Sequence, residues 1–217
     1  MLEISSVRVT IASVHALRGF SLQVGAGSMV SLVGRNGAGK TSLMRTVMGH
    51  LAASSGAVRF EGADLARLPR HARARLGIGY MPEDRGLVPE LTVEENILVP
   101  VWVSKALRAD DCLKRVYGVL PELHAIRGRR ALLLSGGQQK MVALARALAV
   151  GTRLLLLDEP FEGLAPALSQ RLSEVIAALR GTRLAVLLSQ SDLNHSRSLV
   201  DREVVIERGA NAQDPTP

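Results

Sequence analysis

The octapeptide GRNGAGKT, residues 34–41, restricts the fold of this chain more than any other stretch. It follows a short apolar segment, MVSLVG (29–34), which is predicted to be a strand, and it leads into KTSLMRTVMG (40–49), which is predicted to be a helix. A G-x-x-x-x-G-K-[ST] pattern between a strand and a helix predicts a loop whose backbone amides bind phosphate groups. A glycine-rich turn that only caps the helix is the alternative, but it does not account for the Lys-Thr pair in this setting.

Every position of this loop is a candidate contact to a nucleotide: Gly34, Arg35, Asn36, Gly37, Ala38, Gly39, Lys40, Thr41 and Ser42. The glycines let the backbone approach the phosphates because they have no Cβ atom. We expect the ammonium group of Lys40 to neutralise the β and γ phosphates, which makes it a catalytic candidate, and the hydroxyl of Thr41 to bind Mg²⁺. The loop therefore predicts a magnesium nucleotide as cofactor.

A pair of carboxylates follows a run of leucines in LLLLDEP, residues 154–160. The leucines predict a buried strand, and in a parallel sheet the carboxyl end of such a strand faces the ligand. Asp158 is therefore a candidate for holding Mg²⁺, and Glu159 is a candidate general base that accepts a proton from the attacking water. Alone, such a pair would be an ordinary strand end. Together with the phosphate loop, it indicates the second half of a nucleotide site.

A second phosphate-binding element is predicted in LLLSGGQQK, residues 132–140, 95 positions after Lys40. Ser135, Gly136, Gly137 and Gln138 stand where a leucine run gives way to a predicted helix. Unpaired amides and the helix dipole favour an anion at such a terminus. The alternative is a serine that caps the helix next to a flexible turn.

The rest of the chain alternates between strands and helices, which predicts an α/β fold with a mostly parallel sheet covered on both faces. Further strands are predicted at 76–81, 153–158, 183–189 and 201–209, and helices at 92–103, 109–120 and 166–180. In the helix at 92–103, Thr92 and Glu95 form a capping box, and Pro100 is expected to end or kink it. The first two strands alternate in polarity and predict a small antiparallel sheet. The tail, 210–217, is expected to be disordered.

Composition excludes several classes of protein. The chain has 217 residues, is 47% apolar and has no apolar run long enough to span a bilayer. The net charge of +7 allows an anionic partner, but the densest basic stretch, RLPRHARARL (67–76), contains no aromatic residue for base stacking. We therefore expect no nucleic-acid partner. The single cysteine allows no internal disulfide and fits a reducing compartment.

Together, GRNGAGKT, LSGGQQ (134–139) and LLLLDEP resemble, in order and spacing, the ATP-binding subunits of ABC transporters. The resemblance covers residues 1–209, and it implies a P-loop NTPase core, an N-terminal antiparallel β subdomain and a helical subdomain at roughly 84–150. It implies a cytoplasmic ATPase held at the inner membrane by permease subunits. It also implies a head-to-tail dimer with a like or different ATPase, in which Ser135, Gly136, Gly137 and Gln138 bind the ATP of the partner chain.

Three longer stretches of the sequence resemble the branched-chain amino-acid uptake subfamily, whose relatives import urea, amides and similar polar solutes. These stretches are YMPEDRGLVPELTVEENI (80–97), DEPFEGLAP (158–166) and VHALRGFSLQV (14–24). Import implies a solute-binding protein outside the membrane. Glu83 stands where many transporters have a glutamine that reaches the metal. The apolar stretch 87–102 that follows is either core or a groove for a permease helix.

The chain also departs from the family pattern. Where most members have a switch histidine, Gln190 is the first candidate, Ser191 the second if the alignment shifts by one, and His195 a remote third. Near Ile11, where an aromatic residue usually stacks on adenine, there is none. Two alternatives to a transport function remain open. One is an ABC ATPase that takes no part in transport, and the other is an ATP-dependent clamp that hydrolyses little ATP.

Overall fold

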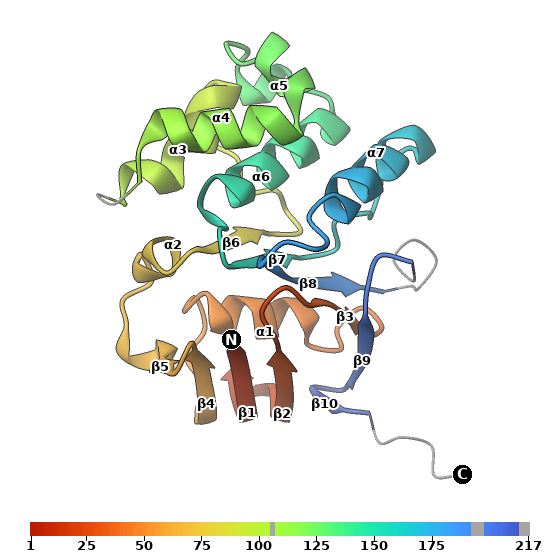
Figure 1. The fold of residues 1–217 in the computed structure, drawn as a ribbon. Coiled ribbons are helices and arrows are strands. Elements are labelled where there is room, and N and C mark those ends of the chain that lie inside the picture. Colours follow the sequence, from red (N-terminus) through yellow and green to blue (C-terminus); the bar gives the residue numbers. More distant parts are fainter. Residues whose placement is uncertain (105–106, 192–197, 213–217) are drawn as a thin grey trace.

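The computed structural model describes residues 1–104, 107–191 and 198–212. Two sheets form the lower half of the molecule in Figure 1, and helices gather above them. One sheet has six strands in the order β10-β9-β3-β8-β7-β6, and the other has four in the order β2-β1-β4-β5. The predicted fold class, a P-loop α/β core with an antiparallel sheet and a helical part, is confirmed.

The six-stranded sheet is parallel except at one edge. Its strands are β3 (Met29–Val33), β6 (Ile78–Met81), β7 (Leu154–Leu157), β8 (Ala185–Gln190), β9 (Arg202–Glu207) and β10 (Ala210–Asn211). Every residue of β7 and β8 is buried, which explains the unbroken leucine run of β7 and the apolar first four residues of β8. Parallel pairing of β3 with β8 and of β8 with β7 brings the carboxyl ends of these strands together. The segments that follow them form the candidate site.

Residues 210–217 were expected to be disordered, but the first two of them form the strand β10. Ala210–Asn211 pairs with β9, and the Asn211 side chain accepts a hydrogen bond from the Ser21 amide and donates one to its carbonyl oxygen. These contacts bridge 190 positions of sequence, so the local polar composition gave no sign of them. Residues 213–217 lie outside the described residues.

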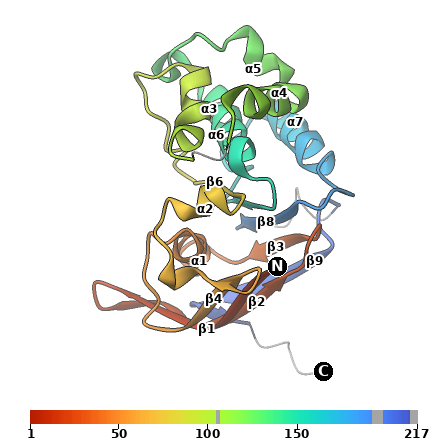
Figure 2. The same ribbon diagram turned by 60° about the vertical axis from the view of Figure 1, so that its left-hand side comes forward.

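The antiparallel sheet and the first helix share a second hydrophobic core. Its strands are β1 (Leu2–Ile11), β2 (Val14–Val24), β4 (Ser55–Phe60) and β5 (Ala63–Asp64). In β1 buried and exposed residues largely alternate, as predicted. The helix α1 (Lys40–Val47) lies between the two sheets in Figures 1 and 2, and its Leu43, Met44 and Val47 are fully buried there. Packing on both sides holds the phosphate loop at the start of α1.

Four helices, α3 (Val93–Trp102), α4 (Ala109–Val119), α5 (Pro121–Ala125) and α6 (Gly136–Val150), pack around the other core with α7 (Pro166–Ala177). The short elements are α2 (Ala72–Arg75) and the 3₁₀ turns η1 (Leu65–Arg67) and η2 (Ala131–Leu133). The predicted capping box is confirmed, because the Thr92 hydroxyl accepts from the Glu95 amide and the Glu95 carboxylate accepts from the Thr92 amide.

Pro100 does not end α3, which continues to Trp102. The expectation that Pro100 ends the helix is wrong, because a proline removes a single backbone hydrogen bond and two more helical residues follow it. The expected alternative, a kink at Pro100, stays a prediction. In the described residues, no helix is long and apolar enough to cross a membrane.

Candidate active site

The phosphate loop joins β3 to α1, and its glycines are required by the surrounding backbone. Gly37 and Gly39 have φ angles of 80° and 111°, in the left-handed region that favours glycine. A Cβ atom on Gly34 would lie 2.4 Å from the Ile206 carbonyl oxygen, and one on Gly39 would lie 2.7 Å from that of Ala16. The loop shape is therefore set by the strands β2 and β9 that enclose it.

Lys40, the first residue of α1, is buried, and its ammonium group turns back over the loop. Nζ donates to the carbonyl oxygens of Gly34 at 2.5 Å and Arg35 at 3.2 Å. It also lies 3.0 Å from Oε1 of Glu159, the residue after Asp158 at the end of β7. An ion pair between two nearly buried side chains therefore joins the phosphate loop to the carboxylate pair that follows β7.

Asp158 is fully buried at the carboxyl end of β7. Its Oδ1 accepts a hydrogen bond from the Ser189 hydroxyl at 2.6 Å, and its Oδ2 lies 3.4 Å from the Tyr80 hydroxyl. Burial raises the pKa of Asp158, and the hydrogen bond from Ser189 partly offsets this effect. Burial also raises the pKa of Tyr80, so its hydroxyl remains a donor to the carboxylate.

The residues predicted to hold a metal lie close together. The Thr41 hydroxyl is 3.4 Å from Oε2 of Glu83. A hydrogen bond between Thr41 and Asp158 also offsets part of the rise that burial causes in the pKa of Asp158. A hydroxyl and two carboxylates are hard oxygen donors, which suit Mg²⁺, and a cation would offset the cost of a buried charge on Asp158. The residues present therefore fit Mg²⁺. No group of three or more His, Cys, Asp or Glu side chains with metal-binding geometry occurs in the described residues, so bound phosphate or water would complete the coordination.

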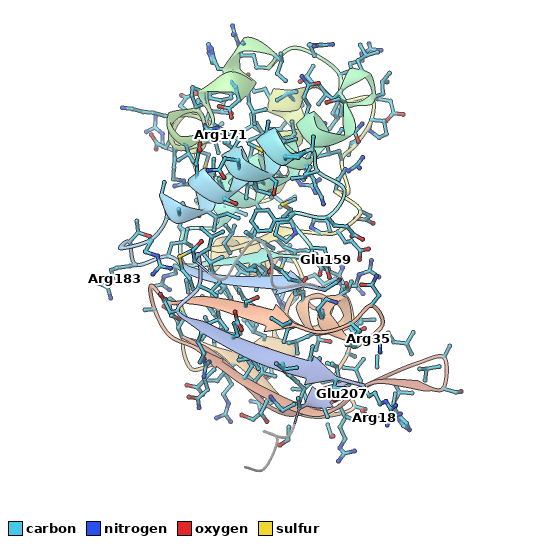
Figure 3. The ribbon with its side chains drawn as sticks, turned by 90° about the vertical axis from the view of Figure 1, so that its right-hand side faces the viewer. Arg18, Arg35, Glu159, Arg171, Arg183 and Glu207 are labelled. Carbon is cyan, nitrogen blue, oxygen red and sulfur yellow. The ribbon has the colours of Figure 1, made fainter. Side chains whose placement is uncertain are left out.

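Glu159 has an unusual backbone that aims its carboxylate at the loop. Its φ angle is 46°, and its amide donates to the Ser189 hydroxyl at 2.9 Å. A non-glycine residue at positive φ is uncommon and is held by its surroundings. Figure 3 shows Glu159 and Arg35 of the loop on the same side of the molecule. Its carboxylate is thus fixed beside Lys40, where a base facing a phosphate would be needed.

Of the two candidates for the switch position, Ser191 places its hydroxyl beside Glu159 and the phosphate loop. Its hydroxyl lies 2.5 Å from Oε1 of Glu159, 2.7 Å from Oδ1 of Asn36 and 3.4 Å from Nζ of Lys40. Its amide donates to Oε2 of Glu159 at 3.1 Å. Ser191 directly follows β8, and the Ser189 hydroxyl two positions earlier contacts the same Asp158–Glu159 segment. Gln190 is buried between them, and its carbonyl oxygen accepts from the Gly34 amide. His195 lies outside the described residues.

We expect Ser191→Ala to lower ATP turnover about 10-fold or more without lowering the melting temperature, because it removes a hydrogen bond to a charged group. Ser191→Thr keeps the hydroxyl and should retain most of the activity. Steady-state phosphate release and a thermal melt of each variant provide the measurement. Wild-type turnover in the alanine variant would show that the Ser191 hydroxyl does not position Glu159.

The element around Ser135 stands apart from this cluster. Ser135 caps α6, its hydroxyl accepting from the Gln138 amide at 3.3 Å and its amide donating to Oε1 of Gln138 at 3.1 Å. Ser135 and Gly136 are exposed, and Gly137 and Gln138 are half-buried. In the part of the chain that the structure describes, no hydrogen bond or ion pair joins these four residues to residues 34–42. A role toward another chain's nucleotide stays a prediction.

Sequence reasoning missed the link between α6 and the end of β7. Buried Lys140 donates from Nζ to the carbonyl oxygens of Glu159, at 2.9 Å, and of Glu162. Burial lowers the pKa of Lys140. The Arg85 guanidinium, in the loop after β6, donates to Oε1 of Gln139 at 2.7 Å. The one available signal was a lysine directly before the apolar run MVALA (141–145).

The cavity beside the phosphate loop has a volume of about 370 Å³. Besides residues of the loop, it is lined by Val14, His15 and Ala16 from β2, and by Glu83 and Glu159. Ile11, at the end of β1, is 41% exposed and does not line it. The base of a nucleotide would therefore meet the start of β2, which offers an imidazole and a valine where the family usually has a larger aromatic ring.

Comparison with known proteins gives a consistent result. The family model described as ABC transporter matches residues 17–162. The chain is 37% identical, over 96% of its length and 90% of the relative's, to the high-affinity branched-chain amino acid transport ATP-binding protein BraG of Pseudomonas aeruginosa. It is 33% identical to the lipopolysaccharide export system ATP-binding protein LptB of Escherichia coli, over 91% and 83% of the two chains. A dimeric bacterial ABC transporter cassette shares the fold, with a TM-score of 0.86, 24% identity and coverage of 98% and 97%.

Proposed function

Because the chain belongs to the ABC transporter family and is an ABC ATPase, we propose that it drives the uptake of branched-chain amino acids or a related polar solute such as urea or an amide. The observation that carries the ATPase part is the meeting of Lys40, Asp158 and Glu159 at the carboxyl ends of β3 and β7. The uptake part is supported by the likeness to BraG. ATP hydrolysis can drive the uptake of a solute across a membrane only if the ATPase binds a membrane-spanning subunit.

In the proposed mechanism, each residue acts on the nucleotide from a position set by the sheet. The amides of the loop and the Lys40 ammonium group bind the β and γ phosphates. Bound Mg²⁺, held by Thr41 and Asp158 with Glu83 nearby, would neutralise phosphate charge. Glu159 takes the proton of the attacking water, and the hydroxyl of Ser191 holds the carboxylate in place.

The proposed assembly has two ATPase chains and membrane-spanning permease subunits, with a solute-binding protein outside the membrane. The chain would be a peripheral protein on the cytoplasmic face of the inner membrane. Ser135 and Gly136 are exposed, as a surface that meets a partner's ATP requires. Both homodimers and heterodimers are compatible with this surface.

Uptake of radiolabelled leucine and urea by cells that lack this chain, complemented with wild type or with Glu159→Gln, tests the transport proposal. We expect one solute to be taken up with wild type only. Unchanged uptake of both solutes, with an envelope defect instead, would favour export, which the likeness to LptB keeps as the alternative. A steady-state ATPase assay distinguishes uptake and export alike from the ATP-dependent clamp, which would hydrolyse little ATP.

The apolar stretch 87–102 divides between the two roles considered for it. Val93, Ile97 and Val101 are buried in the helical core, whereas Trp102 is 57% exposed. We expect Trp102→Asp to preserve ATP binding and the melting temperature but to abolish co-purification with co-expressed permease subunits, because a charge in an apolar contact costs several kcal/mol. Val205→Asp, an equally drastic change at another exposed apolar position, is the matched control. A lowered melting temperature for Trp102→Asp alone would show that Trp102 serves packing.

A further inference from the structure

Lys140 is a buried cation that the proposed mechanism does not use. It lies in the first half of α6 and is 4% exposed, and no salt bridge among the described residues involves it. Nζ donates instead to two main-chain carbonyl oxygens, that of Glu159 at 2.9 Å and that of Glu162. Figure 1 shows α6 above β7, the strand that leads into this pair. A buried cation without an ion pair costs free energy, so stability alone does not account for it.

The two carbonyl oxygens belong to a tight turn that contains Glu159. The Glu162 amide donates to the Glu159 carbonyl oxygen at 3.3 Å, which closes the turn, and Glu159 itself has a φ angle of 46°. This left-handed conformation is disfavoured for a residue with a Cβ atom, because Cβ approaches the following carbonyl oxygen. Glutamate does not select such a backbone by itself, so contacts with the surroundings must hold it.

Two side chains hold the peptide groups on either side of the Glu159 Cα atom. The Ser189 hydroxyl accepts a hydrogen bond from the Glu159 amide at 2.9 Å, and the Lys140 ammonium group donates to the Glu159 carbonyl oxygen. Because φ and ψ are the only soft rotations between these two groups, holding both fixes the direction in which the side chain leaves the backbone. That direction brings the carboxylate to 3.0 Å from Nζ of Lys40.

We propose that Lys140 is a positioning residue for the catalytic base, and that its ammonium group holds the main chain of Glu159 in the conformation that directs the carboxylate to the phosphate loop. The proposal rests on the proposed function, because it takes Glu159 as the base. Lys140 does not line the cavity beside the phosphate loop, so it acts through Glu159 and not on the nucleotide. Its loss should therefore slow hydrolysis and leave the affinity for ATP unchanged.

Lys140→Met tests this role, because methionine keeps an unbranched apolar side chain and removes the donor. We expect kcat to fall about 10-fold or more, with the dissociation constant for ATP within about 2-fold of wild type. Lys140→Gln keeps an N–H donor on a side chain one bond shorter, and its rate should lie between the two. Single-turnover hydrolysis, equilibrium ATP binding and a thermal melt are measured on each variant.

A double-mutant cycle with Glu159→Gln separates positioning of the base from a general loss of structure. If Lys140 acts by placing the Glu159 carboxylate, Lys140→Met should leave the slow residual hydrolysis of Glu159→Gln unchanged within about 2-fold. A purely structural role would lower the rate by the same factor in both backgrounds. Single turnovers with protein in excess, followed for hours, make the residual rate measurable.

Arg115→Met is the matched control, because it also removes a cation that holds α6 through a main-chain carbonyl oxygen. The Arg115 guanidinium donates to the carbonyl oxygen of Ala149 at 2.5 Å, at the opposite end of α6 from the turn around Glu159. This variant should hydrolyse ATP at close to the wild-type rate, even where its melting temperature falls.

Wild-type turnover in folded Lys140→Met, or an equal loss with and without the Glu159 carboxylate, would overturn the proposal. If Lys140→Met does not fold, Lys140→Gln takes its place in the cycle and the same two outcomes decide. Failure of the proposed function is seen separately, because Glu159→Gln alone would then hydrolyse ATP at the wild-type rate.

Discussion

Glu159→Gln is expected to lower ATP turnover ~10²-fold or more while ATP binding is retained. Glutamine has nearly the same shape and can still accept the hydrogen bond from the Ser191 amide, but it cannot take a proton from water. The loop amides, Lys40 and Thr41 are left in place. Glu159 also carries the negative charge 3.0 Å from Lys40, so its removal frees that ammonium group for phosphate. Affinity for ATP should therefore be unchanged or higher.

The measurement combines single-turnover hydrolysis with equilibrium binding of ATP to the same preparation. Glu162→Gln is the matched control, because Glu162 is an exposed carboxylate in the loop that follows Glu159 and faces solvent. It should hydrolyse ATP at close to the wild-type rate. Wild-type turnover in Glu159→Gln would refute the assignment of Glu159 as the base, whatever its effect on binding.

Motif spacing predicted those parts of the site that local backbone determines. Lys40 and Thr41 lie in one loop, and Asp158 follows a strand that is recognisable from four leucines. Their meeting follows from a general rule, that neighbouring parallel strands present their carboxyl ends at one edge. A second rule made the fold class predictable, because a parallel strand buried on both faces, such as β7, is apolar throughout whereas β1 alternates.

Features that depend on exact register or on distant partners could not be predicted in this way. Whether Gln190 or Ser191 faces the phosphate loop depends on a shift of one residue in β8, which reverses every side chain. β10 is held by Asn211 and Ser21, and Lys140 by carbonyl oxygens around Glu159. Each is a contact between segments far apart in sequence, and no short window of residues contains both partners.

Two inactive variants, Lys40→Ala and Ser135→Arg, are expected to restore activity to each other when mixed. Lys40→Ala removes the cation that pairs with phosphate, and Ser135→Arg places a long side chain at the exposed start of α6. In the implied head-to-tail dimer, each ATP is bound by Lys40 of one chain and Ser135 of the other. A mixed dimer then has one site with both groups intact and one site with neither.

Random pairing would make about one quarter of all sites intact, so the mixture should reach up to about one quarter of wild-type turnover if the sites act independently. If Ser135 served the nucleotide of its own chain, every site in every dimer would lack one group, and the mixture would stay at background. The assay requires high protein concentration and a wild-type sample that hydrolyses ATP under the same conditions, because the natural partner could be a different ATPase. Lys40→Ala also leaves the carboxylate of Glu159 buried without its cation, so Lys40→Met, which keeps the apolar stem, should be run beside it with a melt of each variant. Background activity in both mixtures of folded variants would contradict a trans site in which one intact copy is sufficient.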